Sequence, residues 1–272
     1  MKLILKTTAY TILGLGLSAV PVRAALSVVP GDLLASFYSV DAGNALGSQT
    51  YVYNLGPASG YREGTVVQGN IDNLANDLAQ TFGPNWATNG EVRWGIVGVV
   101  GISDPVTLGD PARTSYYSQS FTGGSPASSA AFTLSSANRT GLAGAVKDYS
   151  VAMNGLSENG ATDGGAQVPV STINDYSDYL PPTKTTHFNI SPSPSTQLSS
   201  AAAGLDLYRF IHTTTGADLS AAYAPADAAV GAGQYIGSFT LSGTGDLSFV
   251  PEPTTGLLAG LCGLLVFRRR RA

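Results

Sequence analysis

Residues 31–56, GDLLASFYSVDAGNALGSQTYVYNLG, decide the expected fold class. Side chains alternate along the first part of this stretch, with Leu34, Ser36, Tyr38 and Val40 on one face and Ala35, Phe37 and Ser39 on the other. Tyr51-Val52-Tyr53 is a second strand-favouring run. The residues between, 41–47, are rich in Gly, Asn and Asp and favour a turn. The stretch therefore predicts two strands joined by that turn.

The next block predicts a helix followed by a strand. Asn70 is a suitable N-cap, and Gly83-Pro84 ends the helical pattern. The apolar positions have helical spacing and form one stripe: Ile71, Leu74, Ala75, Leu78 and Phe82. After a turn at Asn89-Gly90, residues 92–99 (VRWGIVGV) predict a buried strand in which glycines allow close packing.

A third block with a regular pattern is LDLYRFIH, followed by QYIGSFTLSGTGDLSFV at residues 234–250. The second part predicts a hairpin that reverses at residues 243–246. A second helix is expected over residues 136–153 from the spacing of Leu142, Val146, Tyr149 and Met153. Residues 114–136 predict loops and short strands. The expected fold is mainly β, an antiparallel sandwich-like body with about two helices.

Both chain ends predict targeting segments rather than parts of this body. Lys2 and Lys6 precede an apolar stretch at residues 9–20, and small residues follow at the positions that a signal peptidase inspects. We therefore expect residues 1–24 to be a secretory signal peptide, cleaved after Ala24 or after Ala25. The body then spans residues 25–249, and residues 250–272 form a separate C-terminal segment that contains a short hydrophobic helix.

The C-terminal segment holds an uncharged run of 14 residues, from Thr254 to Phe267. As a helix it would be about 21 Å long, whereas a hydrocarbon core is about 30 Å thick. It is too short to span a bilayer of ordinary thickness as a permanent anchor, but it is long enough to insert into a thinned one. Four arginines, Arg268, Arg269, Arg270 and Arg271, follow it and favour the cytoplasmic side. Two interpretations remain, a marginal tail anchor or a sorting signal that is later removed.

Val250, Pro251, Glu252 and Pro253, followed by the apolar run and the arginines, resemble the PEP-CTERM sorting domain of exported proteins from Gram-negative bacteria. The resemblance covers residues 250–272. It implies processing near the motif by an exosortase-type membrane transpeptidase, after transient association with the inner membrane. It also implies release to the cell surface or extracellular matrix of a bacterium that makes exopolysaccharide.

Parts of the body resemble a group of exported PEP-CTERM proteins of unassigned activity. The segments that carry this resemblance are GDLLASFY, YVYNLG, the FGPNW and VRWGIVG pair, and YIGSFTLSGTGDLSF. No catalytic or binding residue comes with that group, so the resemblance implies export but assigns no chemistry to the body.

Composition narrows the function classes. The chain has a formal net charge of −4, but seven of its 14 basic residues lie in the two end segments. The body carries seven basic and seventeen acidic residues, near −10 in net charge, which argues against nucleic acid as a partner. The single cysteine, Cys262, lies in the C-terminal segment, so the body has no disulfide, cysteine nucleophile or thiolate metal site.

The usual catalytic and metal motifs are missing from the sequence. It has no Gly-x-Ser-x-Gly elbow, no phosphate loop and no His-Glu-x-x-His, and residues 174–178 (NDYSD) do not match a calcium loop. The two histidines, His187 and His212, are interpreted as ordinary polar residues. We therefore predict no cofactor, no metal and no enzymatic activity.

These observations leave three functions open. The leading hypothesis is an exported structural or adhesive protein of an exopolysaccharide matrix or biofilm, with signal peptidase and the transpeptidase as processing partners. The second is a carbohydrate-binding module, with or without calcium, built on Trp86, Trp94 and tyrosines 116, 117, 176, 179 and 208. The third is a glycoside-active enzyme using carboxylates among Glu91, Asp104 and Asp110. Trp94 is the expected core residue, and Asp104 and Asp110 each precede a proline and favour turn starts.

Overall fold

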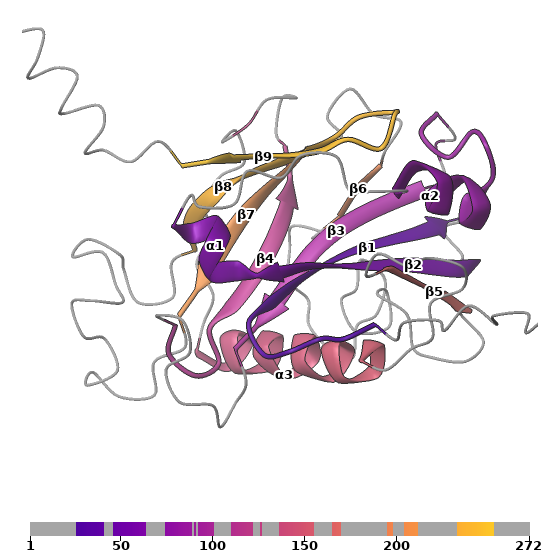
Figure 1. The fold of residues 1–272 in the computed structure, drawn as a ribbon. Coiled ribbons are helices and arrows are strands. Elements are labelled where there is room, and N and C mark those ends of the chain that lie inside the picture. Colours follow the sequence, from indigo (N-terminus) through magenta and orange to yellow (C-terminus); the bar gives the residue numbers. More distant parts are fainter. Residues whose placement is uncertain are drawn as a thin grey trace, which may run out of the picture.

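The computed structural model describes residues 26–40, 46–63, 74–88, 90, 92–100, 110–121, 126, 136–154, 165–169, 195–197, 204–211 and 233–252. Within these ranges, nine strands form one sheet and three helices pack against it (Figure 1). The predicted class, mainly β with antiparallel pairing, is confirmed.

The strands are β1 Asp32–Val40, β2 Leu46–Pro57, β3 Val92–Val99, β4 Ser115–Ser120, β5 Gly165–Pro169, β6 Ser195–Gln197, β7 Leu205–Phe210, β8 Gln234–Leu241 and β9 Leu247–Pro251. Their order across the sheet is β5-β2-β1-β3-β4-β7-β8-β9, and β6 pairs with β3. The helices are α1 Ala58–Arg62, α2 Leu74–Phe82 and α3 Ser136–Met153.

The predicted N-terminal hairpin is confirmed as β1 and β2, with Phe37 opposite Tyr51. On its other side β1 pairs with β3, where Phe37 lies opposite Trp94. Because β1 has a strand on each side and packed layers on both faces, residues 32–38 are all buried. The alternation seen in the sequence therefore separates two apolar cores rather than a core and a solvent face.

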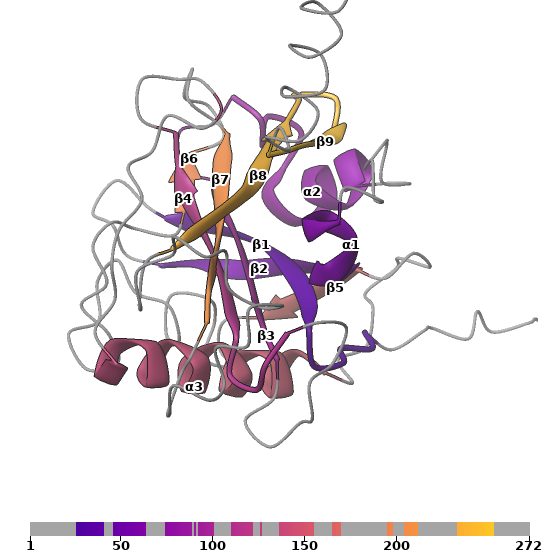
Figure 2. The same cartoon turned by 90° about the vertical axis from the view of Figure 1, so that its left-hand side faces the viewer.

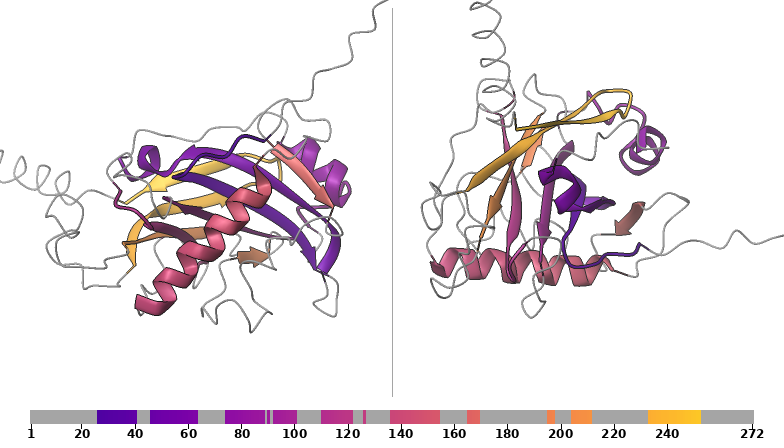
Figure 3. Two further views of the ribbon diagram at one scale, coloured as in Figure 1. Left: turned by 90° about the horizontal axis from the view of Figure 1, so that it is seen from below. Right: turned by 60° about the vertical axis from the view of Figure 1, so that its left-hand side comes forward.

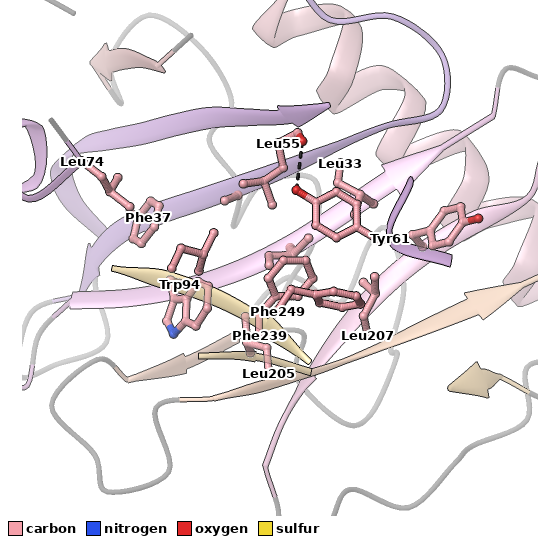
Figure 4. Close-up of a cluster of buried hydrophobic side chains, with 14 of the residues drawn as sticks. Leu33, Phe37, Leu55, Tyr61, Leu74, Trp94, Leu205, Leu207, Phe239 and Phe249 are labelled. Atoms are coloured by element: carbon pink, nitrogen blue, oxygen red, sulfur yellow. Dashed lines mark hydrogen bonds between the residues drawn. The ribbon is translucent and has the colours of Figure 1, made fainter. Parts of the chain in front are cut away.

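One face of the curled sheet encloses a cluster of aromatic and aliphatic side chains (Figure 4). Phe37 and Trp94 stack with ring centroids 5.9 Å apart and an interplanar angle of 9°. Phe239 and Phe249, from β8 and β9, lie 4.6 Å apart in the same cluster. Two central strands and the β8–β9 end of the same curled sheet thus contribute to one core. Fully burying one such ring contributes about 1.5–3 kcal/mol.

Helix α3 covers the opposite face (Figures 2 and 3). Its predicted range is confirmed, and the four residues of the predicted stripe, Leu142, Val146, Tyr149 and Met153, are fully buried. The hydroxyls of Tyr149 and Ser36 lie 2.5 Å apart and link α3 to the centre of β1. A second apolar cluster of α3, β1–β4 and β7 residues stabilises this layer.

Three local features differ from the sequence expectation or extend it. The short helix α1 was not predicted, because its five residues give no measurable periodicity. Strand β4, Ser115–Ser120, lies within residues 114–136, where loops and short strands were expected without defined bounds. Helix α2 is described from Leu74, so the predicted cap Asn70 and the first stripe residue Ile71 lie outside the described residues.

The predicted end segments are almost entirely outside the described ranges. These include the cleavage residues Ala24 and Ala25, the run from Thr254 to Phe267, and the four arginines Arg268 to Arg271. Among the residues that are described, none of the helices has the length and apolar character needed to span a membrane.

Candidate functional site: the motif end of the sheet

Two of the four predicted sorting-motif residues belong to the folded sheet, and a third follows directly. Val250 and Pro251 are the last residues of β9, and Glu252 follows them; Pro253 lies outside the described residues. The ordered sheet therefore extends past residue 249, where the body was expected to end. The reason is that Phe249 is buried in the core and keeps the chain in register with β8 for two more residues.

The motif backbone is paired with β8. Val250 lies opposite Ser238 and Pro251 opposite Gly237, and the Glu252 N–H donates to the Ile236 carbonyl at 2.9 Å. Pro251 has no N–H to lose in this pairing, which suits a proline near the end of an edge strand. The side chain of Val250 points to solvent and is 52% exposed.

A chain of polar side chains lies beside the motif on β7 and β8. The Tyr235 and Ser238 hydroxyls are 2.6 Å apart, and the Ser238 hydroxyl donates to the buried carboxylate of Asp206. Burial raises the pKa of Tyr235, and the negative charges of Asp206 and Glu252 raise it further, although its contact with Ser238 opposes the shift. Burial also raises the pKa of Glu252. The motif carboxylate therefore belongs to the electrostatic environment of β8.

A second polar cluster joins α1 to β7 and is centred on the buried carboxylate of Asp110. Arg209 contacts it through Nε at 2.8 Å and through Nη2 at 2.6 Å, and Arg62 contacts it at 2.7 Å. The Tyr116 hydroxyl donates to its other oxygen at 2.7 Å. Arg209 also donates to Gln234 of β8 at 3.2 Å. One carboxylate thus contacts α1, β4 and β7, and Arg209 extends the cluster to β8.

Two members of this cluster, Arg62 and Tyr116, have shifted pKa values. Burial alone would lower the pKa of Arg62, but the charge of Asp110 and the contacts with Tyr116 and Glu63 together outweigh it, and the pKa is raised. Burial and the charge of Asp110 raise the pKa of Tyr116. Two guanidinium groups and a neutral phenol therefore surround one carboxylate, with the exposed Glu63 carboxylate 3.2 Å from Arg62.

Asp110 corrects part of the sequence interpretation. It does precede a turn, since the Thr114 N–H donates to the Pro111 carbonyl at 3.1 Å. Its side chain, however, is only 3% exposed and contacts two arginines, which the turn interpretation did not include. Arg62, Asp110 and Arg209 are far apart in the sequence, and no local spacing signals their contact. The other two carboxylates of the glycosidase hypothesis, Glu91 and Asp104, lie outside the described residues.

The other buried aspartates also link separate elements. Asp77 of α2 accepts a hydrogen bond from the Tyr51 hydroxyl of β2 at 2.7 Å. Asp32 at the start of β1 accepts from the Asn54 side chain of β2 at 2.8 Å and from the Val29 N–H at 3.0 Å. Each carboxylate crosslinks elements of the fold, an arrangement that stabilises a scaffold.

The aromatic residues considered for sugar stacking are mostly in the core. Trp94 is fully buried, as expected, and Trp86 is only 4% exposed. Tyr116, Tyr117 and Tyr208 are at most 2% exposed. These five side chains therefore offer no stacking surface, while Tyr176 and Tyr179 lie outside the described residues.

Within the described ranges, no group of three or more His, Cys, Asp or Glu side chains is placed to hold a metal ion. His187, His212 and the NDYSD segment at residues 174–178 are outside those ranges. Comparison of the chain with protein-family models, with curated proteins and with solved structures found no match.

Proposed function

We propose that this chain is an exported protein that is sorted through residues 250–272 and then remains at the cell surface or in an exopolysaccharide matrix. Its role there is structural or adhesive, and it is not an enzyme. The observation that carries the proposal is the order of three signals, Val-Pro-Glu-Pro, an uncharged run and four arginines, which begins on the last strand of the body. The signal-peptide pattern at residues 1–24 supports the same route.

Two properties of the body support a scaffold role. Its buried aspartates are used in contacts between elements, as at Asp110 and Asp77. Its strong negative charge favours solubility outside the cell. The carbohydrate-binding alternative loses the buried tryptophans and tyrosines on which it partly depended.

Processing is tested by changing Pro251, Glu252 and Pro253 together to alanine in the full chain, in a host that contains an exosortase-type enzyme. We expect an uncleaved form in the membrane fraction, detected by an antibody to the body. The control is Ser248→Ala, an exposed position on the same strand but outside the motif, which should be processed normally. Normal cleavage and release of the triple variant would contradict the proposal.

The role of the body is tested by titrating the released protein with the producer's own polysaccharide, with and without a chelator. A purely structural protein gives no saturable binding in either condition. Saturable binding that persists with chelator would instead support a carbohydrate-binding module, and binding lost with chelator would support one that uses calcium.

A further inference from the structure

We propose that the outer edge of β9 is protected against pairing with a second copy of this chain, by Pro251 and by a like-charge contact between Asp246 and Glu252. The proposal goes beyond the proposed function, because it concerns self-association of the folded body. It holds whether or not residues 250–272 are a sorting signal, so the two can fail separately.

Strand β9 is the last strand of the sheet and, among the described strands, pairs with β8 alone (Figure 1). Its side chains at Ser248, Val250 and Pro251 are exposed. The free side of such a strand presents N–H and C=O groups to which another strand can add. A molecule with this edge stays monomeric only if some feature of the strand opposes that addition.

The register of the β8–β9 hairpin decides which backbone groups face the free edge. At one end the Glu252 N–H donates to the Ile236 carbonyl at 2.9 Å, and at the other the Ser242 N–H donates to the Asp246 carbonyl at 3.0 Å. The pairing between these two points runs without a shift in register. Bonded and non-bonded pairs therefore alternate regularly along β9.

This alternation gives neighbouring residues of β9 opposite directions. Ser248 and Val250 direct their N–H and C=O groups toward β8. The backbone nitrogen and carbonyl groups of Leu247, Phe249 and Pro251 face the free edge instead. No described residue is hydrogen-bonded to the outward groups of Leu247 or Phe249. The outward row thus offers two N–H donors and then a proline, which has none.

A second copy would overlap β9 most fully in an antiparallel arrangement centred on Phe249. The two Phe249 residues would exchange hydrogen bonds, and Pro251 of each copy would lie opposite Leu247 of the other. Pro251 gives no N–H to that Leu247 carbonyl, and its ring crowds the oxygen. Because the arrangement has two-fold symmetry, the loss occurs at both ends of the pair.

The same arrangement brings like charges together. Asp246 and Glu252 lie three residues before and three residues after Phe249, so each would be opposite the other residue of the second copy. Both side chains are exposed and point to the same face of the strand. Directly opposed like charges destabilise a strand pair. The proline and the two carboxylates therefore oppose the same pairing.

The first test measures amide hydrogen exchange residue by residue in the full chain, purified in detergent, at two protein concentrations. We expect the Phe249 amide to exchange at least about tenfold faster than the Val250 amide, which is bonded to β8, and at a rate independent of concentration. Slow exchange of Phe249 at both concentrations would overturn the proposal, since the edge would already be covered. Protection that grows with concentration would also overturn it, since the wild type would then pair.

The second test removes the proline and reverses one charge. Pro251→Val combined with Asp246→Lys supplies the missing N–H and makes the contact with Glu252 of the second copy attractive. Sedimentation equilibrium of the full chain in density-matched detergent gives the dimer dissociation constant. We expect it to be at least about tenfold lower than in the wild type, because two hydrogen bonds and two charge pairs are gained.

The matched control adds Glu252→Lys to that variant, which restores like charges in the same register while reducing the net negative charge further. It should dimerise about fivefold more weakly than the variant without it. All forms keep the apolar run at residues 254–267, so any association through that run is common to them. A first variant no tighter than the wild type, or a control as tight as that variant, would overturn the proposal. If the variants do not fold, hydrogen exchange in the wild type decides.

Discussion

Two hairpins of this protein, β1–β2 and β8–β9, both show alternating side chains in the sequence. In the sheet, however, β1 lies between two other strands, whereas β9 lies at the edge. In β1 both alternating sets of side chains are buried, because β2 and β3 flank the strand and packed layers cover both faces. In β9 only Leu247 and Phe249 are buried, while Ser248, Val250 and Pro251 are exposed. The comparison shows that alternation fixes which side chains share a face, whereas position in the sheet decides whether that face is a core.

The short helix α1 connects the two hairpins. It follows β2 directly, and its Tyr61 ring contacts Phe239 and Phe249 from the second hairpin. Its last residue, Arg62, binds Asp110, which also holds Arg209 of β7. The strand that carries the motif is therefore stabilised partly by the helix that follows the N-terminal hairpin.

The largest expected difference between the hairpins is in the unfolding free energy lost when one side chain in each is truncated to alanine. Phe37→Ala in β1 should lower the free energy of unfolding by about 3–5 kcal/mol, since it leaves a cavity beside Trp94. Val250→Ala in β9 should change it by less than about 0.5 kcal/mol, because that side chain is mostly in solvent already. Urea unfolding measures both. Equal losses would show that the two hairpins are buried alike.

The second largest effect is expected from Asp110→Asn, which should weaken the connection between the two hairpins. The neutral amide leaves two largely buried guanidinium groups without their countercharge, so we expect a loss of about 3 kcal/mol in unfolding free energy. Glu63→Gln is the control, because that carboxylate also contacts Arg62 but is 59% exposed. It should cost less than about 0.5 kcal/mol. Similar losses for both variants would exclude Asp110 as the centre of this connection.

A smaller effect, on the pH dependence of the unfolding free energy, is expected where Tyr51 of the N-terminal hairpin contacts Asp77 of α2. Burial raises the pKa of Asp77 above its ordinary 3.8, although the Tyr51 hydrogen bond opposes the shift. A raised folded pKa means that the folded state holds the proton more tightly, so this contribution is present below pH 3.8 and is lost as pH rises through the folded value. Asp77→Asn should remove this component from a series of unfolding curves.

Tyr51→Phe gives the complementary result for Asp77. Without the hydroxyl that lowers the pKa, the loss of stability should extend to higher pH than in the wild type. A Tyr51→Phe profile that shifts to lower pH, or an Asp77→Asn profile identical to the wild type, would contradict the assignment.

The smallest expected effect lies in the turn of the second hairpin. Asp246 accepts hydrogen bonds from the Thr244 hydroxyl at 2.6 Å and the Ser242 hydroxyl at 3.2 Å, all three residues being exposed. Asp246→Ala should lower the unfolding free energy by only about 0.5 kcal/mol. Hydrogen exchange should quicken in β8 and β9 and not in β1. A change in β1 exchange would mean that this turn contributes to the whole sheet.

Much of the fold was predictable because its signals are local. The strands of both hairpins, β3 and the full range of α3 follow from side-chain periodicity and turn residues. Helix α1 was missed because five residues do not span two helical turns. No local pattern assigns Trp86 to the core, and its burial depends on packing against residues from other elements.

The candidate site was predictable only in part for the same reason. The motif residues 250–253 were found because they are adjacent in the sequence. The Asp110 cluster was not, because its partners lie on α1, β4 and β7 and meet only after the sheet has formed.

The sequence by itself determined the positions of the hairpin strands, β3 and α3, the two face sets of β1 and the order of the C-terminal signals, since each depends on neighbours a few residues away. Tertiary structure decided which strands became central, which carboxylates met arginines, and that the motif begins inside the sheet. Those outcomes depend on contacts between distant segments. Their free energy comes from burial and pairing, and so it exists only once the sheet has curled around its core.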